Sequence, residues 1–307
     1  MSGSPVAAII VNWKSPQDVL RLVESLLPNV EDGLRFVVLE NGSNDGSHEV
    51  FSAAFTGLRF AGHVTYVVSE TNLGFCGGVN RAVEAGFASG PRPEWVWCLN
   101  PDTHPETHIL PRLIEVAEQS SAGVVTARAG SPPDGFAGEG NWPLAYFAPG
   151  RFWKTRPVPG AAWWPTGRYH GGWALFRGSL VERLQAQPGG FLRERFFMYH
   201  DEWDTSLRAH ELGEKVVVAA DTFVHHYSPT RDALPGLADA RMYYLSRNGV
   251  SMARWIPWWL LPVAFPVHLA RDLTWYCGLK HESLRAYLWG LADGLRGRYG
   301  RWRHHPS

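Results

Sequence analysis

Short apolar runs alternate with amphipathic segments through the first 120 residues of the chain. The first run is followed by Ser15 and Pro16, which are favourable at a helix start, and then by apolar residues at helical spacing. This alternation predicts an α/β fold, with a Rossmann-like, mostly parallel sheet and helices on both faces. The strand-like runs are 6–11, 34–39, 63–68, 95–99 and 123–127.

A polar segment follows each of the first four runs. Asn12 ends the first, Glu40 and Asn41 end the second, residues 72–80 follow the third, and Asn100-Pro101-Asp102 follows the fourth. Each segment alone is typical of an ordinary loop. Because parallel strands end at the same edge of a sheet, the four together indicate a binding crevice. The usual dinucleotide and P-loop glycine motifs are absent.

The second half of the chain is less regular. Residues 128–169 are rich in Gly, Pro, Trp and Phe, and their aromatic side chains could stack on a sugar, lie on lipid or pack onto the sheet. A strand is predicted at 170–176. An acidic cluster at 201–204 then opens a helix, where carboxylates also interact favourably with the helix dipole. Strand-like runs at 216–219 and 223–227 carry paired histidines, which are candidates for a metal ligand, a base or a structural role.

The C-terminal part is apolar, rich in Trp and basic at its end. The segment 254–266 contains three prolines and is too short and too broken for a spanning helix. With the Arg-rich tail it predicts an interfacial segment on an anionic membrane surface. The alternative is a helical pair packed on the catalytic domain or on a second subunit, as in a homodimer.

Composition narrows the class of protein. The chain has 307 residues, 45% of them hydrophobic, with 29 basic and 29 acidic residues and a formal net charge of +0. This length supports a large core, and the charge balance argues against general nucleic-acid binding. Cys76, Cys98 and Cys277 lack a metal-type spacing, and no basic-then-apolar leader precedes the first strand. We therefore expect free thiols and a cytoplasmic location, peripheral on the inner face of the membrane if the tail binds lipid.

The order of these motifs resembles the family 2 glycosyltransferases of the GT-A fold, most closely a rhamnosyltransferase-like branch. The resemblance covers about 6–228, with a looser likeness at 244–248 and 291–300. It implies a catalytic domain over 1–230, divided into a nucleotide-sugar-binding half (1–127) and an acceptor-binding and catalytic half (128–230). Residues 231–307 form a C-terminal helical extension.

The resemblance also implies roles for individual residues. Asp102 matches the surviving acid of the family's Asp-x-Asp metal site, and His225 matches a late metal-binding His, with His226 as the alternative. The base is Glu202 by register or Asp201, because the family's usual Glu-Asp order is inverted here. The implied nucleotide-binding residues are Asn12, Glu40, Asn41, Asn72, Gly74, Gly78, Asn80, Asn100 and Asp102, and the implied acceptor-binding residues are Trp173, Tyr199 and Trp203.

These parts fit an inverting transfer of a sugar from a nucleoside diphosphate. A carboxylate base activates an acceptor hydroxyl, and Mg²⁺ or Mn²⁺ at Asp102 neutralises the leaving diphosphate. A dTDP-deoxysugar is the favoured donor and a UDP-sugar the alternative. The acceptor is a glycan, a lipid-linked glycan or a small molecule. Two other interpretations are a non-catalytic sugar- or membrane-binding protein on the same fold, and a sugar nucleotidyltransferase, which would need a basic glycine loop that the chain lacks.

Overall fold

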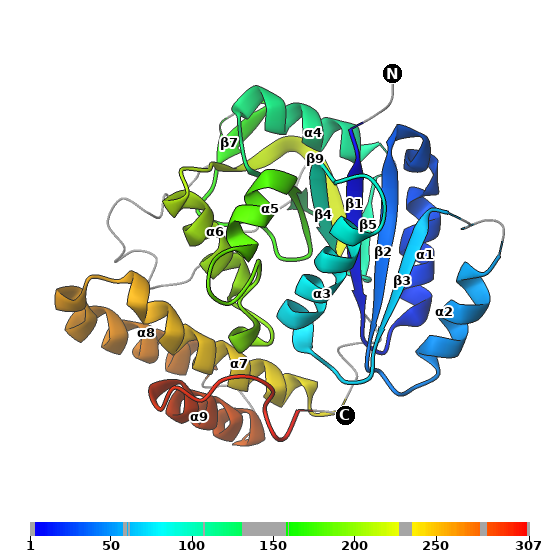
Figure 1. The fold of residues 1–307 in the computed structure, drawn as a ribbon. Helices are drawn as coiled ribbons and strands as arrows, with labels where there is room; N and C mark the ends of the chain where they lie inside the picture. The colour runs from blue at the N-terminus through cyan, green and yellow to red at the C-terminus, as the bar shows by residue number, and fades with distance from the viewer. Residues whose placement is uncertain are drawn as a thin grey trace.

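A computed structural model describes residues 4–57, 60, 62–106, 108–130, 158, 160–226, 235–276 and 281–305. Its centre is a single sheet in the order β3-β2-β1-β4-β8-β6-β9-β5, with β7 paired to β9 (Figure 1). The strands are β1 (Val6–Asn12), β2 (Leu34–Asn41), β3 (Val64–Ser69), β4 (Trp95–Leu99), β5 (Thr103–Pro105), β6 (Val124–Ala129), β7 (Trp163–Pro165), β8 (Trp173–Arg177) and β9 (Val216–His226).

The sheet has a parallel half and a mixed half. Strands β1 to β4 pair in parallel, whereas β8 is antiparallel to both β4 and β6. The short β5 and β7 pair antiparallel with β9. The predicted runs at 216–219 and 223–227 are joined in one strand, β9, which ends at His226, and Tyr227 lies outside the described residues. The register of β9 with β6 shifts between Thr126 and Arg128. The predicted strand at 170–176 begins only at Trp173, because residues 170–172 form a turn.

Helices cover both faces of the sheet. Alternate residues of β1 belong to two different apolar clusters, with Ile9 in one and Ile10 in the other, as expected of a strand buried on both sides. The α/β class, with helices on both faces and a helical C-terminal part, is therefore confirmed. The helices that flank the sheet are α1 (Pro16–Leu26), α2 (Ser47–Phe55), α3 (Gly74–Ala88), α4 (Ile109–Ser120), α5 (Gly178–Gln185) and α6 (Asp201–Glu211).

The C-terminal helices pack against the segment that precedes α6. Figure 1 shows α7 (Leu237–Met252), α8 (Leu261–Tyr276) and α9 (His281–Leu295) grouped on the side of the molecule away from α4. A third apolar cluster joins Tyr244 of α7 and Tyr287 of α9 to Phe197 and Met198, which precede α6. In the described part of the chain no helix is long and apolar enough to cross a membrane. Cys76 and Cys98 are buried free thiols, and Cys277 lies outside the described residues.

Candidate functional site

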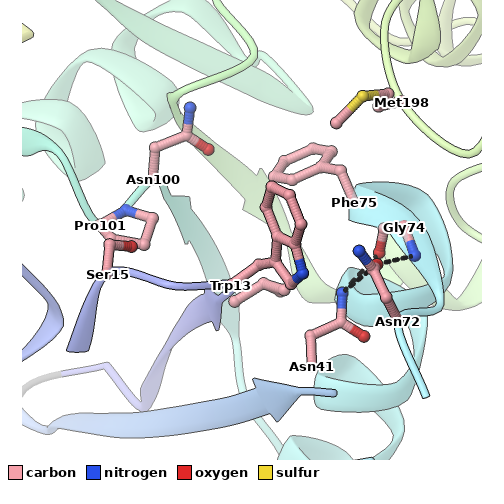
Figure 2. Close-up of a pocket in the computed structure, with 10 residues that line it drawn as sticks. Trp13, Ser15, Asn41, Asn72, Gly74, Phe75, Asn100, Pro101 and Met198 are labelled. Atoms are coloured by element: carbon pink, nitrogen blue, oxygen red, sulfur yellow. Dashed lines mark hydrogen bonds between the residues drawn. The ribbon is translucent and has the colours of Figure 1, made fainter. Parts of the chain in front are cut away.

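The carboxyl ends of β1, β2 and β4 lie at one edge of the sheet, as the sequence predicts. Asn12 pairs with Glu40 across β1 and β2, and Ile10 pairs with Leu99 across β1 and β4. A pocket opens beyond these strand ends, and Figure 2 shows the Trp13 indole in the middle of its lining. The pocket is lined by Val11, Trp13, Ser15, Asn41, Asn72, Gly74, Phe75, Asn100, Pro101 and Met198.

Several of the predicted nucleotide-binding side chains build the loops of this pocket. The Glu40 carboxylate accepts hydrogen bonds from the backbone N–H groups of Gly42 (3.1 Å) and Ser43 (2.8 Å). The Asn12 amide donates to the Ser43 hydroxyl (3.2 Å) and accepts from the Ser15 N–H (3.2 Å). Asn12 and Glu40 are buried, so their contacts fix the backbone around the pocket.

The loop after β3 is fixed in the same way. The Asn41 amide accepts from the Leu73 N–H (3.0 Å) and donates to the Gly74 carbonyl (3.0 Å). The side-chain amide oxygen of Asn72 accepts from the Gly74 N–H (2.8 Å) and from the Asn41 side-chain nitrogen (3.3 Å; Figure 2). Asn72 is only half-buried, which leaves its side chain at the pocket wall.

Three other predicted residues hold α3 against its surroundings. Gly74 has a φ of +76°, and a Cβ there would lie 2.5 Å from the Phe197 carbonyl oxygen. A Cβ on Gly78 would lie 2.8 Å from Val11. The Asn80 amide donates to the Leu192 carbonyl (2.8 Å) and accepts from its N–H (2.9 Å). Asn80 therefore secures the loop before α6 and does not line the pocket.

Asp102 faces His226 at the end of β9. The two side chains approach to 3.2 Å between Oδ1 and Nε2, and Asp102 is buried. Thr103 pairs with His226 and His104 pairs with His225 across β5 and β9. Because side chains alternate along a strand, His225 points to the opposite face from His226. The geometry therefore brings His226, rather than His225, to Asp102.

A carboxylate oxygen beside an imidazole nitrogen is a donor set that fits a divalent ion such as Mn²⁺. Within the described ranges no three His, Cys, Asp or Glu side chains converge as a self-sufficient metal cluster. The pair of Asp102 and His226 therefore suits an ion that takes further ligands from a bound molecule.

The two adjacent carboxylates at the start of α6 have different environments. Asp201 is buried, and burial, followed by the negative charge of Glu202, raises the pKa of Asp201 well above its usual range. The Glu202 side chain is 20% exposed and forms a 3.0 Å ion pair with Arg168. Of the two carboxylates, Glu202 is therefore the one that a bound molecule can reach.

The turn at 170–172 lies between Glu202 and the end of β4. A Cβ on Gly171 would lie about 4 Å from the Glu202 carboxylate, and the Gly172 carbonyl accepts from the Asn100 N–H at 2.8 Å. His170 stacks on Trp173 with 3.6 Å between ring centroids, and burial lowers the pKa of His170 to about 3. A Cβ on Gly172 would lie 3.2 Å from the Asn100 side-chain nitrogen, so the missing side chain matters for the close approach at Gly172.

The three predicted acceptor-binding residues are placed differently from one another. Trp173 is 1% exposed, and its indole N–H donates to the Ala127 carbonyl (3.0 Å). Its ring stacks on His170, so no face of the indole is open to a sugar. Tyr199 and Trp203 are half-buried, and the Arg168 guanidinium lies 5.2 Å from the Trp203 ring centroid. Of the aromatic residues expected at 128–169 to stack on a sugar, lie on lipid or pack onto the sheet, Trp142 and Trp153 lie outside the described residues.

Sequence reasoning missed three contributors to the site. Arg168 stands in an unremarkable Gly-Arg-Tyr-His segment, and only the fold reveals that it meets Glu202. Arg247 and Asn248 were noted only as part of a looser likeness, yet both are buried beneath the residues that precede α6.

Comparison with known proteins gives a family match. The model of the family described as Glycosyl transferase family 2 matches residues 7–184, which is more than half of the chain. The low-salt glycan biosynthesis hexosyltransferase Agl10 of Haloferax volcanii is 26% identical over 216 residues, which are 66% of this chain and 61% of that protein. The chain thus spans less than two thirds of the length of this relative.

Solved structures share the architecture. The mannosyltransferase PcManGT from Pyrobaculum calidifontis, in complex with GDP-Man and Mn²⁺, aligns over 97% of this chain and 75% of its own, with a TM-score of 0.57 and 19% identity. Residues 1–349 of S. aureus TarS, in complex with UDP-GlcNAc, align over 95% of this chain and 81% of theirs, with a TM-score of 0.57 and 13% identity. These likenesses establish the GT-A fold.

Proposed function

Because the chain belongs to Glycosyl transferase family 2, we propose that it transfers a sugar from a nucleoside-diphosphate donor to an acceptor hydroxyl, with inversion at the anomeric carbon. One observation carries this proposal. The pocket at the strand ends, the pair of Asp102 with His226, and the accessible carboxylate of Glu202 are connected through Asn100, Pro101 and the 170–172 turn.

The donor nucleotide is proposed to occupy the pocket of Figure 2. Aromatic rings at Trp13 and Phe75 suit a flat base, and the amides at Asn72 and Asn100 suit polar groups of the base or ribose. Asn12, Glu40 and Asn41 contribute by fixing the loops that shape the pocket. The proposed donor half (1–127) and acceptor half (128–230) meet at this pocket.

The diphosphate is proposed to extend from the pocket towards Asp102. Asp102 and His226 would hold Mg²⁺ or Mn²⁺, which supplies charge neutralisation for the leaving diphosphate when bound. Phosphate oxygens and water would complete the coordination, since these two side chains alone provide too few ligands.

Glu202 is proposed as the general base. It accepts the acceptor hydroxyl proton while that oxygen attacks the anomeric carbon on the face opposite the leaving diphosphate, so a single displacement inverts the centre. Arg168 holds the Glu202 carboxylate in place at 3.0 Å. Asp201 is buried behind it, where burial raises its pKa and keeps its carboxyl group away from an incoming acceptor.

We propose the donor and the acceptor by chemical class. A dTDP-deoxysugar is our first choice of donor because the motif order resembles the rhamnosyltransferase-like branch, and a UDP-sugar is the second. GDP belongs in the test because the similar PcManGT structure contains GDP-Man. The acceptor is a glycan, a lipid-linked glycan or a small molecule, with Tyr199 and Trp203 beside it.

Calorimetric titration of dTDP, UDP and GDP, each with and without Mn²⁺, tests the donor site. We expect one nucleotide to bind, with an affinity that falls at least tenfold when Mn²⁺ is omitted or Asp102 is replaced by Ala. His226→Ala should reproduce this loss, and His225→Ala is its matched control. A loss with His225→Ala and none with His226→Ala would refute the assigned metal pair.

Turnover then separates an enzyme from a binding protein on the same fold. With the nucleotide identified, its sugar conjugates are supplied and release of nucleoside diphosphate is followed, while NMR of the transferred sugar reports the anomeric configuration. Retention would contradict the single displacement. Nucleotide binding without turnover across the donor and acceptor panel would favour the non-catalytic interpretation.

We also propose that the apolar surface of residues 258–267, which lead into α8 and form its first turns, contacts an anionic membrane peripherally. Trp258 and Trp259 are 81% and 60% exposed, and Val263 and Val267 continue the apolar surface at four-residue spacing. Paired Trp side chains favour the membrane–water interface, and the exposed arginines of 296–303 suit anionic lipid. Vesicles of phosphatidylglycerol should sediment the wild type and not Trp258→Ser/Trp259→Ser. Loss of a dimer in that variant, without vesicle binding by the wild type, would assign the surface to a second subunit.

A further inference from the structure

The residues directly before the proposed base have an unfavourable backbone conformation. Phe197, Tyr199 and His200 have φ angles of 65°, 64° and 65°. None of them is glycine, and such a conformation persists only where the surrounding contacts impose it. This 197–200 turn leads without a break into α6, which begins at Asp201. The direction of Glu202 therefore depends on what holds the turn.

The side-chain amide of Asn248, on α7, holds the turn by donating hydrogen bonds to backbone carbonyl groups of the turn and of the residue before it. The Asn248 side chain is fully buried, and its amide nitrogen lies 3.1 Å from the Phe196 carbonyl oxygen, 2.8 Å from that of Met198 and 3.0 Å from that of Tyr199. Arg247 Nε donates to the Asn248 amide oxygen at 2.9 Å. That bond fixes which way the amide faces, so its N–H groups are directed at the turn.

Arg247 extends the same support. Its guanidinium donates to the carbonyls of Phe196 (2.6 Å), Arg195 (3.2 Å) and Gly300, and the side chain is 1% exposed. It lies 4.8 Å from the ring centroid of Tyr244. A planar fork of donors can satisfy several carbonyls at once, which a lysine ammonium cannot do in the same geometry.

The turn is held on its other side by α3 of the donor pocket. The Phe197 carbonyl accepts from the Cys76 N–H at 3.0 Å, while the Phe197 ring stacks on Tyr244 at 5.2 Å. Met198, at the centre of the turn, lines the pocket. The turn is thus fixed between α3 and α7, in contact with the donor site and directly before the carboxylates.

We propose that Arg247 and Asn248 are positioning residues that hold the 197–200 turn and thereby aim Glu202 at the acceptor. The proposal rests on the proposed function. Without these hydrogen bonds the turn would relax towards negative φ, and α6 would begin in a different direction. A displacement of about 1 Å at the reacting groups can cost on the order of 10²-fold in rate. The donor pocket would keep most of its affinity, because its other loops are fixed by Asn41 and Asn72.

The test compares Asn248→Ala and Arg247→Lys with Arg241→Lys, an exposed position on the same helix. Nucleoside-diphosphate release from the nucleotide sugar is measured with water as acceptor, so that the sugar and a proton are the other products. We expect kcat to fall about 10²-fold in the first two variants and stay unchanged in the third. The Kd of the nucleotide with Mn²⁺ should stay within about threefold in all three.

Hydrogen exchange supplies a readout that does not need turnover. The peptide covering 197–204 should exchange faster in Asn248→Ala and Arg247→Lys, while peptides of β1 and β4 remain protected. Unchanged exchange at 197–204, or unchanged kcat in a folded variant, would overturn the proposal. Arg247→Lys is the milder change. If it removed hydrogen-exchange protection throughout the protein, Arg247 and Asn248 would have a purely structural role, and the proposal would be overturned. Absence of turnover in the wild type would refute the proposed function instead.

Discussion

The loops after β1, β2 and β3 are fixed by one another's side chains, through hydrogen bonds that span at most 33 residues of the chain. The 197–200 turn contacts α3, but its side-chain hydrogen bonds come from about fifty residues further along the chain. The Glu40 carboxylate accepts from backbone N–H groups two and three residues away, and the Asn72 side-chain oxygen accepts from the N–H group two residues away. Asn248 donates to carbonyls that are 49, 50 and 52 residues distant. The donor side of the site is therefore largely self-supporting, while the base is held by the C-terminal helices.

This difference separates binding from chemistry. Changes on the donor side should alter nucleotide affinity and leave the chemical step in place. Changes around the turn should reduce turnover and leave nucleotide affinity in place. Gly74 is where the two regions touch, and changes there should affect both.

The largest expected effect comes from removing the base. Glu202→Gln keeps the size of the side chain and can still contact Arg168, but it cannot accept the acceptor proton. We expect kcat to fall by about 10²–10⁴-fold with nucleotide Kd unchanged. Stopped-assay measurement of nucleoside-diphosphate release checks this. Asp201→Asn is the matched neighbour, and a larger loss of kcat there than in Glu202→Gln would transfer the role of base to Asp201.

Gly74→Ala should disturb both regions at once. Its φ of +76° disfavours a side chain, and the new Cβ would lie 2.5 Å from the Phe197 carbonyl oxygen. We expect a loss of about 2–3 kcal/mol in the free energy of unfolding, measured by urea denaturation, together with lower nucleotide affinity and lower kcat. Gly213→Ala is the control, since φ is +82° there but nothing lies within 4 Å. Equal losses in the two variants would argue that the contact with Phe197 is unimportant.

Asp201 should make stability depend on pH. Because its folded-state pKa is raised, the folded protein binds this proton more tightly than the unfolded chain. The resulting stabilisation is complete below the unfolded pKa of about 3.9 and is lost as pH rises through the raised folded value. Asp201→Asn removes the titration, so its free energy of unfolding relative to wild type should increase in urea titrations as pH rises above about 4 and through the raised folded-state pKa.

A control at an exposed carboxylate accompanies the pH series. Asp221→Asn, at a side chain that is 56% exposed, is measured over the same pH range to correct for the general effect of removing one carboxylate. If Asp201→Asn and wild type kept a constant difference in the free energy of unfolding over the whole range, Asp201 would not retain its proton in the folded protein.

The smallest effect is expected on the donor side. Asn72→Ala removes the oxygen that accepts from the Gly74 N–H, and it should cost about 1 kcal/mol of stability. Nucleotide Kd should rise several-fold, because Asn72 lines the pocket, while kcat at saturating donor stays near the wild-type value. Calorimetry and product release together check this. A drop in kcat at saturation would show that the two regions are not separable.

The parallel half of the fold and the edge that carries the site were predictable from the sequence. Apolar runs ending in polar turns at Asn12, Glu40 and Asn100 place the strands and their carboxyl ends, because burial on both faces and turn chemistry are local properties. The α/β class and the helical C-terminal part follow from the same patterns and are confirmed.

Contacts set by strand register could not be predicted in this way. The choice between His225 and His226 depends on pairing with β5, a three-residue strand that has no apolar pattern of its own. Trp173 has the residue type of a stacking platform, yet the sheet buries it beneath His170. Arg247 and Asn248 occupy a helix whose spacing indicates packing and gives no sign of the carbonyl groups that they meet.

The fifty-residue gap between the 197–200 turn and Asn248 has a consequence for synthesis. A ribosome adds about 5–20 residues per second, so several seconds pass between the emergence of Glu202 and that of its support on α7. During that interval the nascent chain already contains β1, β2 and β4, whose carboxyl ends form the proposed donor pocket. We expect a growing chain to acquire the ability to hold a nucleotide before it acquires the ability to transfer a sugar.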